Sequence, residues 1–290
     1  MAFVRLHTNS IYTYLGSALT LEKLVNASKD YVALTDFNSL VGSVTFTRLC
    51  ANKKIKPIIG LDLTLDDNLF TFIVKSEEGY QNLLYLSKLF NTNEFKVETI
   101  KGHTSGLAVI LSSIQSNLYA KLTDLGDTKF AYYLKAYNDI FPDFYIGLEI
   151  YGKEDLTATN KLREFLKKRD YRLLAFPFIR YLKKEDEITY RLVKAIKEDS
   201  HLEQTVKTMN GVNYYPSDDE VKALYAEVYA DDSTICKVAT NELRVDQGQH
   251  MSIYDNVFSL REDINNVIAA HIGFARKNNL FEDSLMKVIV

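Results

Sequence analysis

The sequence predicts an α/β fold in which strands and helices alternate and the strands form a largely parallel sheet or barrel. Short apolar runs alternate with amphipathic stretches at helical spacing over roughly the first 200 residues, a pattern typical of strands joined by helices. The chain has 290 residues, and 47% of them are hydrophobic. That is enough for one sizeable core, or for one domain with an appendage.

The individual elements follow from this alternation. The expected strands cover residues 3–7, 31–35, 55–63, 70–74, 107–111, 144–150 and 173–179. The expected helices cover residues 21–29, 41–53, 76–90, 128–141, 162–168 and 185–197, with an exposed loop at 91–105. Thr20 and Ser76 stand at two helix starts, where a hydroxyl can accept a hydrogen bond from a free backbone amide.

Beyond about residue 200 the pattern changes to helices. Ser217 and Glu220 form a capping box that starts a helix reaching about residue 228. Residues 232–241 and 264–277 are also predicted to be helical, and residues 245–257 form an extended connector. The chain ends on apolar residues without a helix stop signal, so we expect it to be a piece of a longer protein.

Composition excludes several classes of protein. The net charge of -3 argues against a dominant basic surface, so tight binding of duplex DNA by this segment alone would need a local patch. Cys50 and Cys236 lie far apart and have no CxxC partner, which excludes a zinc ribbon and fits a reducing cytoplasm. No secretory signal or run of about 18 apolar residues is present, so we expect a cytoplasmic protein outside the membrane.

The positions that would carry chemistry are the strand ends. In a barrel of parallel strands, working residues lie at the carboxyl ends of the strands and in the loops that follow. Here those positions are residues 7–10, 36–39, 60–62 and 178–181.

Several of these segments carry a family resemblance. The runs FVRLHTNS (3–10), ALTD (33–36), KPIIG (56–60) and SEEGYQNL (76–83) resemble, in order and spacing, the polymerase and histidinol phosphatase (PHP) domain. This is the domain at the N-terminus of bacterial DNA polymerase III alpha subunits. Similar runs at 105–109, 144–149, 173–175 and 180–182 extend the resemblance over about residues 3–240. Each run is weak alone, whereas the ordered set is specific.

The resemblance implies a distorted (β/α)7 barrel over residues 1–200. Residues 201–290 would then be a mainly helical part that begins the link to a polymerase palm. In active members of the family a cluster of two or three metal ions hydrolyses phosphate esters. Such a cluster needs His and carboxylate ligands that converge from several strand ends and share a bridging water.

Most positions on which the resemblance places these metal ligands hold residues that bind metal poorly or not at all. The positions are His7, Asn9, Gly16, Asp36, Phe37, Asp62, Leu69, Ser113, Lys153, Phe178 and Arg180. His7, Asp36 and Asp62 retain ligand chemistry, but Lys153 and Arg180 would place positive charge in the same cleft. We therefore expect no catalytic metal, no other cofactor and no catalysis by this segment.

Structural roles compete with functional ones at the retained positions. His7 fits a strand-end histidine that is hydrogen-bonded to a neighbour. Asp36 fits a cap for a helix beginning near Leu40. An ion pair of Arg180 with Asp36 or Asp62 would fill the site with protein groups.

Two hypotheses remain. In the first, the chain is the PHP domain of a replicative DNA polymerase III alpha subunit, a DNA-directed DNA polymerase (nucleotidyltransferase), and serves as scaffold and interaction module. The resemblance then implies contacts with the parent's palm and thumb and with a proofreading exonuclease subunit. The parent protein would bind the sliding clamp and primed DNA, and its palm would bind Mg. In the second, the chain is an active PHP phosphoesterase or 3′-5′ exonuclease that uses His7, Asp36 and Asp62.

Overall fold

The computed structural model describes residues 3–152, 155–202 and 213–229. Its strands are β1 (His7–Thr8), β2 (Tyr31–Leu34), β3 (Lys56–Leu65), β4 (Asn68–Val74), β5 (Leu107–Ser112), β6 (Phe144–Leu148), β7 (Leu173–Ala175) and β8 (Phe178–Ile179). Its helices are α1 (Leu21–Ala27), α2 (Ser43–Lys53), α3 (Glu77–Asn91), α4 (Val97–Ile100), α5 (Leu118–Ile140), α6 (Asp155–Lys167), the 3-10 turn η1 (Lys184–Asp186), α7 (Glu187–Lys197) and α8 (Asp218–Tyr229).

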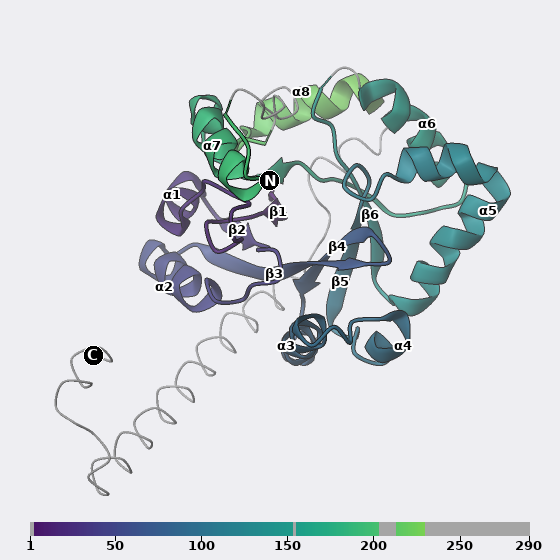
Figure 1. Ribbon diagram of the computed structural model, residues 1–290, viewed down its shortest axis with the longest axis horizontal. Helices are drawn as coiled ribbons and strands as arrows, with labels where there is room; N and C mark the ends of the chain where they lie inside the picture. Colours follow the sequence, from purple (N-terminus) through teal and green to yellow (C-terminus); the bar gives the residue numbers. More distant parts are fainter. Residues whose placement is uncertain (1–2, 153–154, 203–212, 230–290) are drawn as a thin grey trace, which may run out of the picture.

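Six strands form one curled sheet in the order β2-β3-β4-β5-β6-β7, with helices around its outside (Figure 1). Strand pairs β2-β3, β5-β6 and β6-β7 are parallel, as expected. Strand β4 is antiparallel to both neighbours. A tight turn at Asp66 and Asp67, in place of a helix, reverses the chain between β3 and β4. Both turn residues have positive φ, which aspartate tolerates better than most residues.

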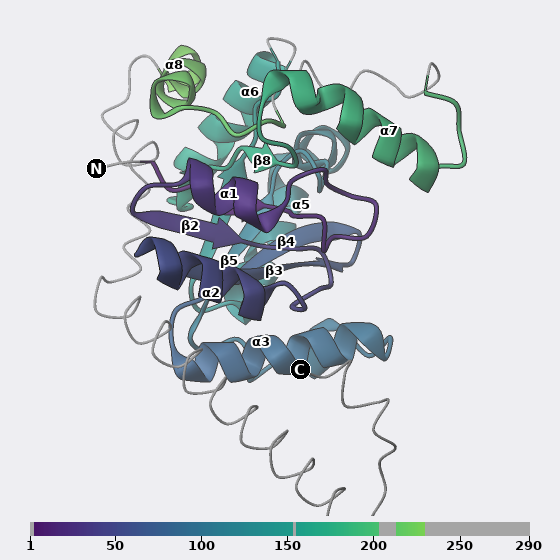
Figure 2. The ribbon, with the colours of Figure 1, turned by 90° about the vertical axis from the view of Figure 1, so that its left-hand side faces the viewer.

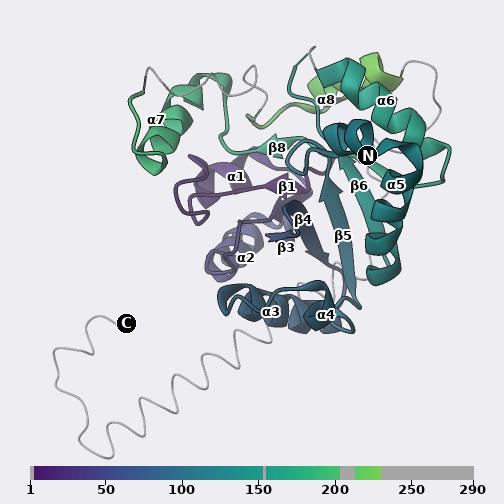
Figure 3. The same cartoon turned by 45° about the vertical axis from the view of Figure 1, so that its right-hand side comes forward.

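Strands β1 and β8 form a parallel pair beside the sheet (Figure 3). The amide of Thr35, just after β2, donates to the carbonyl of Thr8 in β1 at 2.8 Å. Strand β8 follows β7 after a break at Pro177, which has no amide hydrogen for a ladder. The start of the chain therefore lies between β2 and β8, and the carboxyl ends of these strands meet at one edge.

Apolar side chains cover both faces of the sheet. On β5, Val109 and Leu111 pack into the large cluster that includes residues of α3, α5 and α6, whereas Ala108 and Ile110 pack on the opposite face. Helices α1 and α2 bury a further cluster around Leu24 and Phe46. Because both faces are covered, the strands appear in the sequence as continuous apolar runs.

The predicted helix starts at Thr20, Ser76 and Ser217 are confirmed. Thr20 accepts from the Lys23 amide at 3.3 Å, and Ser76 accepts from the Gly79 amide at 3.1 Å. In the capping box, the Glu220 amide donates to Ser217 Oγ, and the Ser217 amide donates to the Glu220 carboxylate.

Several predicted boundaries were wrong. Helix α5 begins at Leu118 and not at residue 128, because Leu118 and Leu122 are buried and Gly126 (φ 71°) joins two helical pieces. The expected loop at 91–105 contains α4, which buries Ile100. Helix α6 starts at Asp155 and not at residue 162, and the strand expected at 3–7 is a strand at His7–Thr8.

The predictions for residues 232–241, 245–257 and 264–277 lie outside the described residues. Within the described ranges, no helix is long and apolar enough to cross a membrane.

Arg5 joins the amino end of the sheet to the start of α8, which packs on α6 (Figure 2). Its Nε donates to the Pro216 carbonyl at 2.7 Å and its Nη2 to Asp218 at 2.8 Å. The buried guanidinium also lies over the Tyr215 ring, 4.4 Å from its centroid. A planar group with several donors is needed for this set of contacts.

We predict that Arg5→Lys lowers the free energy of unfolding by about 2 kcal/mol, because an ammonium cannot replace these contacts together. Urea denaturation measures the change. Arg48→Lys is the control: Arg48 is exposed on α2, and the change is expected to be below about 0.5 kcal/mol. Equal effects of the two substitutions would contradict the anchoring role of Arg5.

Candidate functional site

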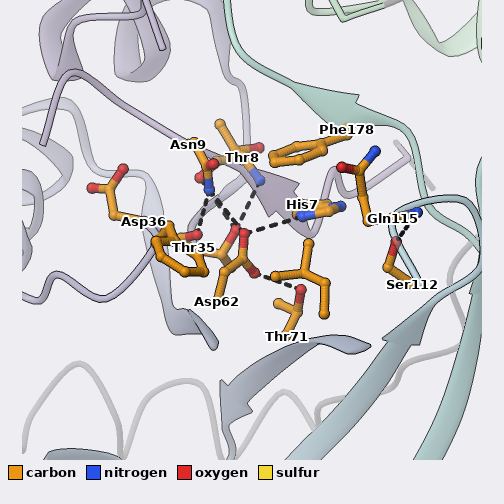
Figure 4. A network of polar contacts seen from close by, with 12 residues as sticks. His7, Thr8, Asn9, Thr35, Asp36, Asp62, Thr71, Ser112, Gln115 and Phe178 are labelled. Atoms are coloured by element: carbon orange, nitrogen blue, oxygen red, sulfur yellow. Dashed lines mark hydrogen bonds and ion pairs between the residues drawn. The ribbon is translucent and has the colours of Figure 1, made fainter. Parts of the chain in front are cut away.

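His7 lies at the centre of the strand ends and is completely buried. Its Nε2 is 3.1 Å from Asp62 Oδ2. Its ring stacks with Phe178 at 3.6 Å between centroids and with Phe176 at 4.4 Å. The pairing of β1 with β8 produces this arrangement, since His7 is directly opposite Phe178 in the register (Figure 4).

Asp62 on β3 is surrounded by donors from the protein. Besides facing His7, Oδ2 accepts from Asn9 Nδ2 at 2.9 Å, and Oδ1 accepts from Thr71 Oγ1 at 2.6 Å. Thr71 is the cross-strand partner of Asp62 on β4, so the hairpin register fixes this contact. Asn9 also donates to the Thr35 carbonyl at 2.5 Å. An imidazole, an amide and a hydroxyl therefore hold this carboxylate.

Glu149, just after β6, is a second buried carboxylate that we did not predict as a site residue. Its Oε2 accepts from the amides of Ile114 at 2.8 Å and Gln115 at 3.2 Å, and from the Ser112 hydroxyl. Its Oε1 accepts from Tyr151 at 2.7 Å and lies 3.7 Å from His7 Nδ1, which has no hydrogen-bond partner among the residues that the structure describes. The sequence signal was present, since Glu149 ends one of the runs that carry the family resemblance.

Tyr151 is the other residue that we missed. Burial, and then the Glu149 carboxylate, raise the pKa of its hydroxyl well above the usual value, which keeps it a donor. Its ring forms a buried apolar cluster with Leu69 and Phe178. No motif marked Tyr151, because a tyrosine after a strand is common at the edge of any core. The predicted position Lys153 lies outside the described residues.

Asp36 is buried in its own hydrogen-bond network. It accepts from the Ser10 amide at 2.5 Å, from Ser10 Oγ at 2.8 Å and from Thr13 Oγ1 at 2.8 Å. It thereby fixes the loop that contains Gly16 to the end of β2. The expected helix cap was wrong, because α2 begins at Ser43, too far along the chain for this side chain. Burial raises the pKa of Asp36 to about 6, although the bonds from Ser10 and Thr13 lower it.

Arg180 does not form the expected ion pair with Asp36 or Asp62. Its guanidinium lies over the Phe178 ring at 4.0 Å and donates to the Tyr190 hydroxyl at 2.5 Å. Within the described ranges Arg180 has no carboxylate partner. The rings of Phe178 and Tyr190 stabilise its positive charge instead.

The remaining predicted positions have structural contacts. Phe37 is 37% exposed and packs edge-on against Phe90 at 5.9 Å between centroids. Ser113 Oγ accepts from the Glu149 amide at 3.0 Å.

The donor set does not fit a cluster of two or three metal ions. In the part of the chain that the structure describes, no three His, Cys, Asp or Glu side chains are arranged to hold a metal ion. The oxygens of Asp62 and Glu149 face protein donors, and the rings of Tyr151 and Phe178 occupy the space beside them. The chemistry that this arrangement supports is hydrogen bonding inside a closed core.

The strand-end site and the curled α/β sheet define the class of protein. The sequence profile of the PHP domain matches residues 5–153, about half of the chain. The chain belongs to the PHP domain family.

Similar proteins of known name identify the kind of PHP domain more closely. DNA polymerase III subunit alpha of Aquifex aeolicus is 25% identical over 253 residues, which is 76% of this chain and 21% of that protein. The Bacillus subtilis subunit is 27% identical over 70% of this chain and 20% of the relative, and the Mycoplasma genitalium subunit is 38% identical over 39% and 13%. The resemblance to the N-terminal region of these subunits is confirmed, and the chain spans about a fifth of their length or less.

Among solved structures, an amidohydrolase from Chromobacterium violaceum with bound sulfate matches 60% of this chain and 86% of its own, with 9% identity and a TM-score of 0.38. This likeness is too distant to bear on function.

We predict that Glu149→Leu destabilises the protein by about 3–5 kcal/mol, because it leaves buried hydroxyl and amide donors without an acceptor. Glu149→Gln is the matched control. It keeps one acceptor oxygen and is expected to cost about half as much. Thermal or urea unfolding compares the two. Equal losses would show that the shape of residue 149, and not its hydrogen bonds, holds this region together.

We also predict that the stability of the protein depends on pH through Asp36. Its pKa rises from 3.8 to about 6 on folding, so the native protein binds this proton more tightly than the unfolded chain. The contribution of Asp36 to stability therefore falls as pH rises through this range, by about 2 kcal/mol between pH 4 and pH 7. The unfolding free energy of the unmodified protein, relative to Asp36→Asn, should fall by this amount over the same range. A difference that does not change with pH would contradict the shift.

Proposed function

We propose that this chain is the N-terminal PHP domain of a replicative DNA polymerase III alpha subunit, in which a former metal site serves as a structural polar core. The family assignment and the much longer relatives support the first part. The observation that carries the second part is that both strand-end carboxylates, Asp62 and Glu149, are satisfied by protein donors.

In this proposal, the family's ligand positions have changed roles. Asn9 takes the place of an imidazole and supplies an amide donor to Asp62, and His7 faces the same carboxylate. Phe178 takes the place of a ligand and stacks on His7, while Leu69 and Tyr151 complete the apolar wall. A carboxylate that a metal ion would otherwise neutralise is thus stabilised by hydrogen bonds. Asp36, Phe37, Ser113, Lys153 and Arg180 are the other vestigial positions.

The proposal extends to the whole architecture. The curled sheet would be the distorted (β/α)7 barrel of the family, with β7 and β8 as one interrupted strand. The hydrogen bond between Thr35 and Thr8 and the pairing of β1 with β8 support closure of the sheet. Residues 201–290 would form the mainly helical part that leads to the polymerase palm.

The role of such a domain would be scaffolding and subunit interaction in DNA replication in the cytoplasm. The parent's palm and thumb and a proofreading exonuclease subunit are the proposed partners. The sliding clamp, primed DNA and Mg would be bound by the parent. Support for a larger parent comes from the relatives, of which this chain covers 13–21%.

Metal analysis tests the proposed loss of catalysis. After chelation and reloading with Mn²⁺ or Zn²⁺, we expect well below one tightly bound ion per chain. We also expect no measurable phosphate-ester or 3′-5′ exonuclease hydrolysis above a protein-free blank. Elemental analysis of the desalted protein measures the bound metal, and an assay with a labelled DNA strand measures the hydrolysis.

The competing hypothesis of an active phosphoesterase makes the opposite prediction. Two or three ions per chain, together with hydrolysis that Asp62→Asn or Asp36→Asn abolishes, would overturn the structural role. The assignment to a longer polymerase is tested separately, by sequencing the gene beyond the codon for Val290. A polymerase reading frame is expected, and a stop codon there would refute the assignment to a polymerase subunit.

A further inference from the structure

Strand β8 is too short to be stable through its own pairing. It consists of Phe178 and Ile179, follows the break at Pro177, and pairs with β1 in a sheet of two strands. An isolated pair of short strands is at best marginally stable in water. Yet β8 positions Phe178, whose ring stacks on His7 (Figure 4). Other contacts must therefore hold β8 in place.

Residues 213–215 bond to β8 and to the residues just after it. The amides of Arg180 and Tyr181 donate to the Asn213 carbonyl at 2.8 and 3.3 Å. In return, Asn213 Nδ2 donates to the Phe178 carbonyl at 3.2 Å. Asn213 is buried, so these bonds are shielded from water. The segment 213–215 thus lies along β8 and is bonded to it in both directions.

Helix α8 follows this segment and anchors it to the body of the protein, where it lies beside α6 (Figure 2). Val221 and Tyr225 are buried in the large core cluster. The Tyr225 hydroxyl donates to the Leu148 carbonyl at the end of β6 at 2.8 Å. The same hydroxyl accepts from the amide of Phe176, between β7 and β8, at 3.2 Å. One side chain therefore joins α8 to β6 and to the interruption that precedes β8.

We propose that residues 213–229 are a clasp that holds β8 against β1, and that the clasp and β8 open together as one unit. This opening costs less free energy than opening the six-stranded sheet, because short strands at an edge open before the core of a sheet does. It removes the Phe178 ring from His7 and uncovers the buried Asp62 beside it. The segment after α7 thereby controls access to the strand ends, whether or not a metal site was ever lost there.

Two substitutions in the 290-residue chain weaken the clasp without emptying the core. Tyr225→Phe removes only a hydroxyl, and the Leu148 carbonyl keeps its bond from the Phe176 amide at 2.9 Å. Asn213→Ala removes the bond to the Phe178 carbonyl and leaves the Asn213 backbone in place. Because each variant loses one or two hydrogen bonds of the clasp, each should shift its opening equilibrium by about tenfold.

Hydrogen exchange of single amides, followed by NMR, measures this opening. The Arg180 and Tyr181 amides report on the clasp, since both donate to Asn213. The Asn9 amide reports on β8, since it donates to the Ile179 carbonyl at 3.0 Å. We expect all three amides to exchange about tenfold faster in both variants. The amide of Val109, in the middle of the sheet, should keep its rate.

Tyr137→Phe is the matched control. It also removes a hydrogen-bonded hydroxyl from a buried tyrosine, but on α5, where the hydroxyl accepts from Asn68 at 3.0 Å. The rates at Arg180 and Asn9 should then stay within about twofold. Faster exchange at Arg180 with an unchanged Asn9 would show that the clasp opens without β8. An equal increase at Val109 would show that the whole sheet opens, and unchanged rates in both clasp variants would show that the clasp does not hold β8. Each of these three results overturns the proposal.

Discussion

The rest of the site depends on one constraint: the carboxylates of Asp62 and Glu149 are buried in the core, away from water. A buried carboxylate is strongly destabilising unless donors replace its water. Here the donors come from four separate parts of the fold. The hairpin register supplies Thr71, and β1 with the residue after it supplies His7 and Asn9. The turn after β5 supplies backbone amides for Glu149, and the segment after β6 supplies the Tyr151 hydroxyl. The strands must pair in this way for the carboxylates to be satisfied.

Asp36 is a third buried carboxylate, with a network of its own. It has hydroxyl and amide donors, yet burial outweighs them and raises its pKa to about 6. Its network faces Ser10 and Thr13, on the loop after β1, while His7 and Asn9 face Asp62. Two acidic residues that the family pattern places in one metal site therefore belong to two separate hydrogen-bond networks here.

The sequence was sufficient for most of the fold, because apolar runs and hydroxyl caps are local signals. It identified the strand ends and the caps at Thr20, Ser76 and Ser217. It failed where a signal was interrupted or not local. Gly126 divides α5 and hid its first half, and the direction of β4 depends on a two-residue turn. Glu149, Tyr151 and the position of Arg180 depend on tertiary contacts, which spacing along the chain does not contain.

The apolar side chains around His7 have a structural role of their own. Phe178 and Phe176 stack on His7, and Leu69 and Tyr151 close the space beside it. Hydrogen bonds are stronger where water and its high dielectric are excluded, so this wall strengthens the contacts of His7 with Asp62. His7 Nδ1 remains 3.7 Å from Glu149, so the imidazole lies between both carboxylates and bonds to one. The apolar wall and the polar network therefore stabilise each other.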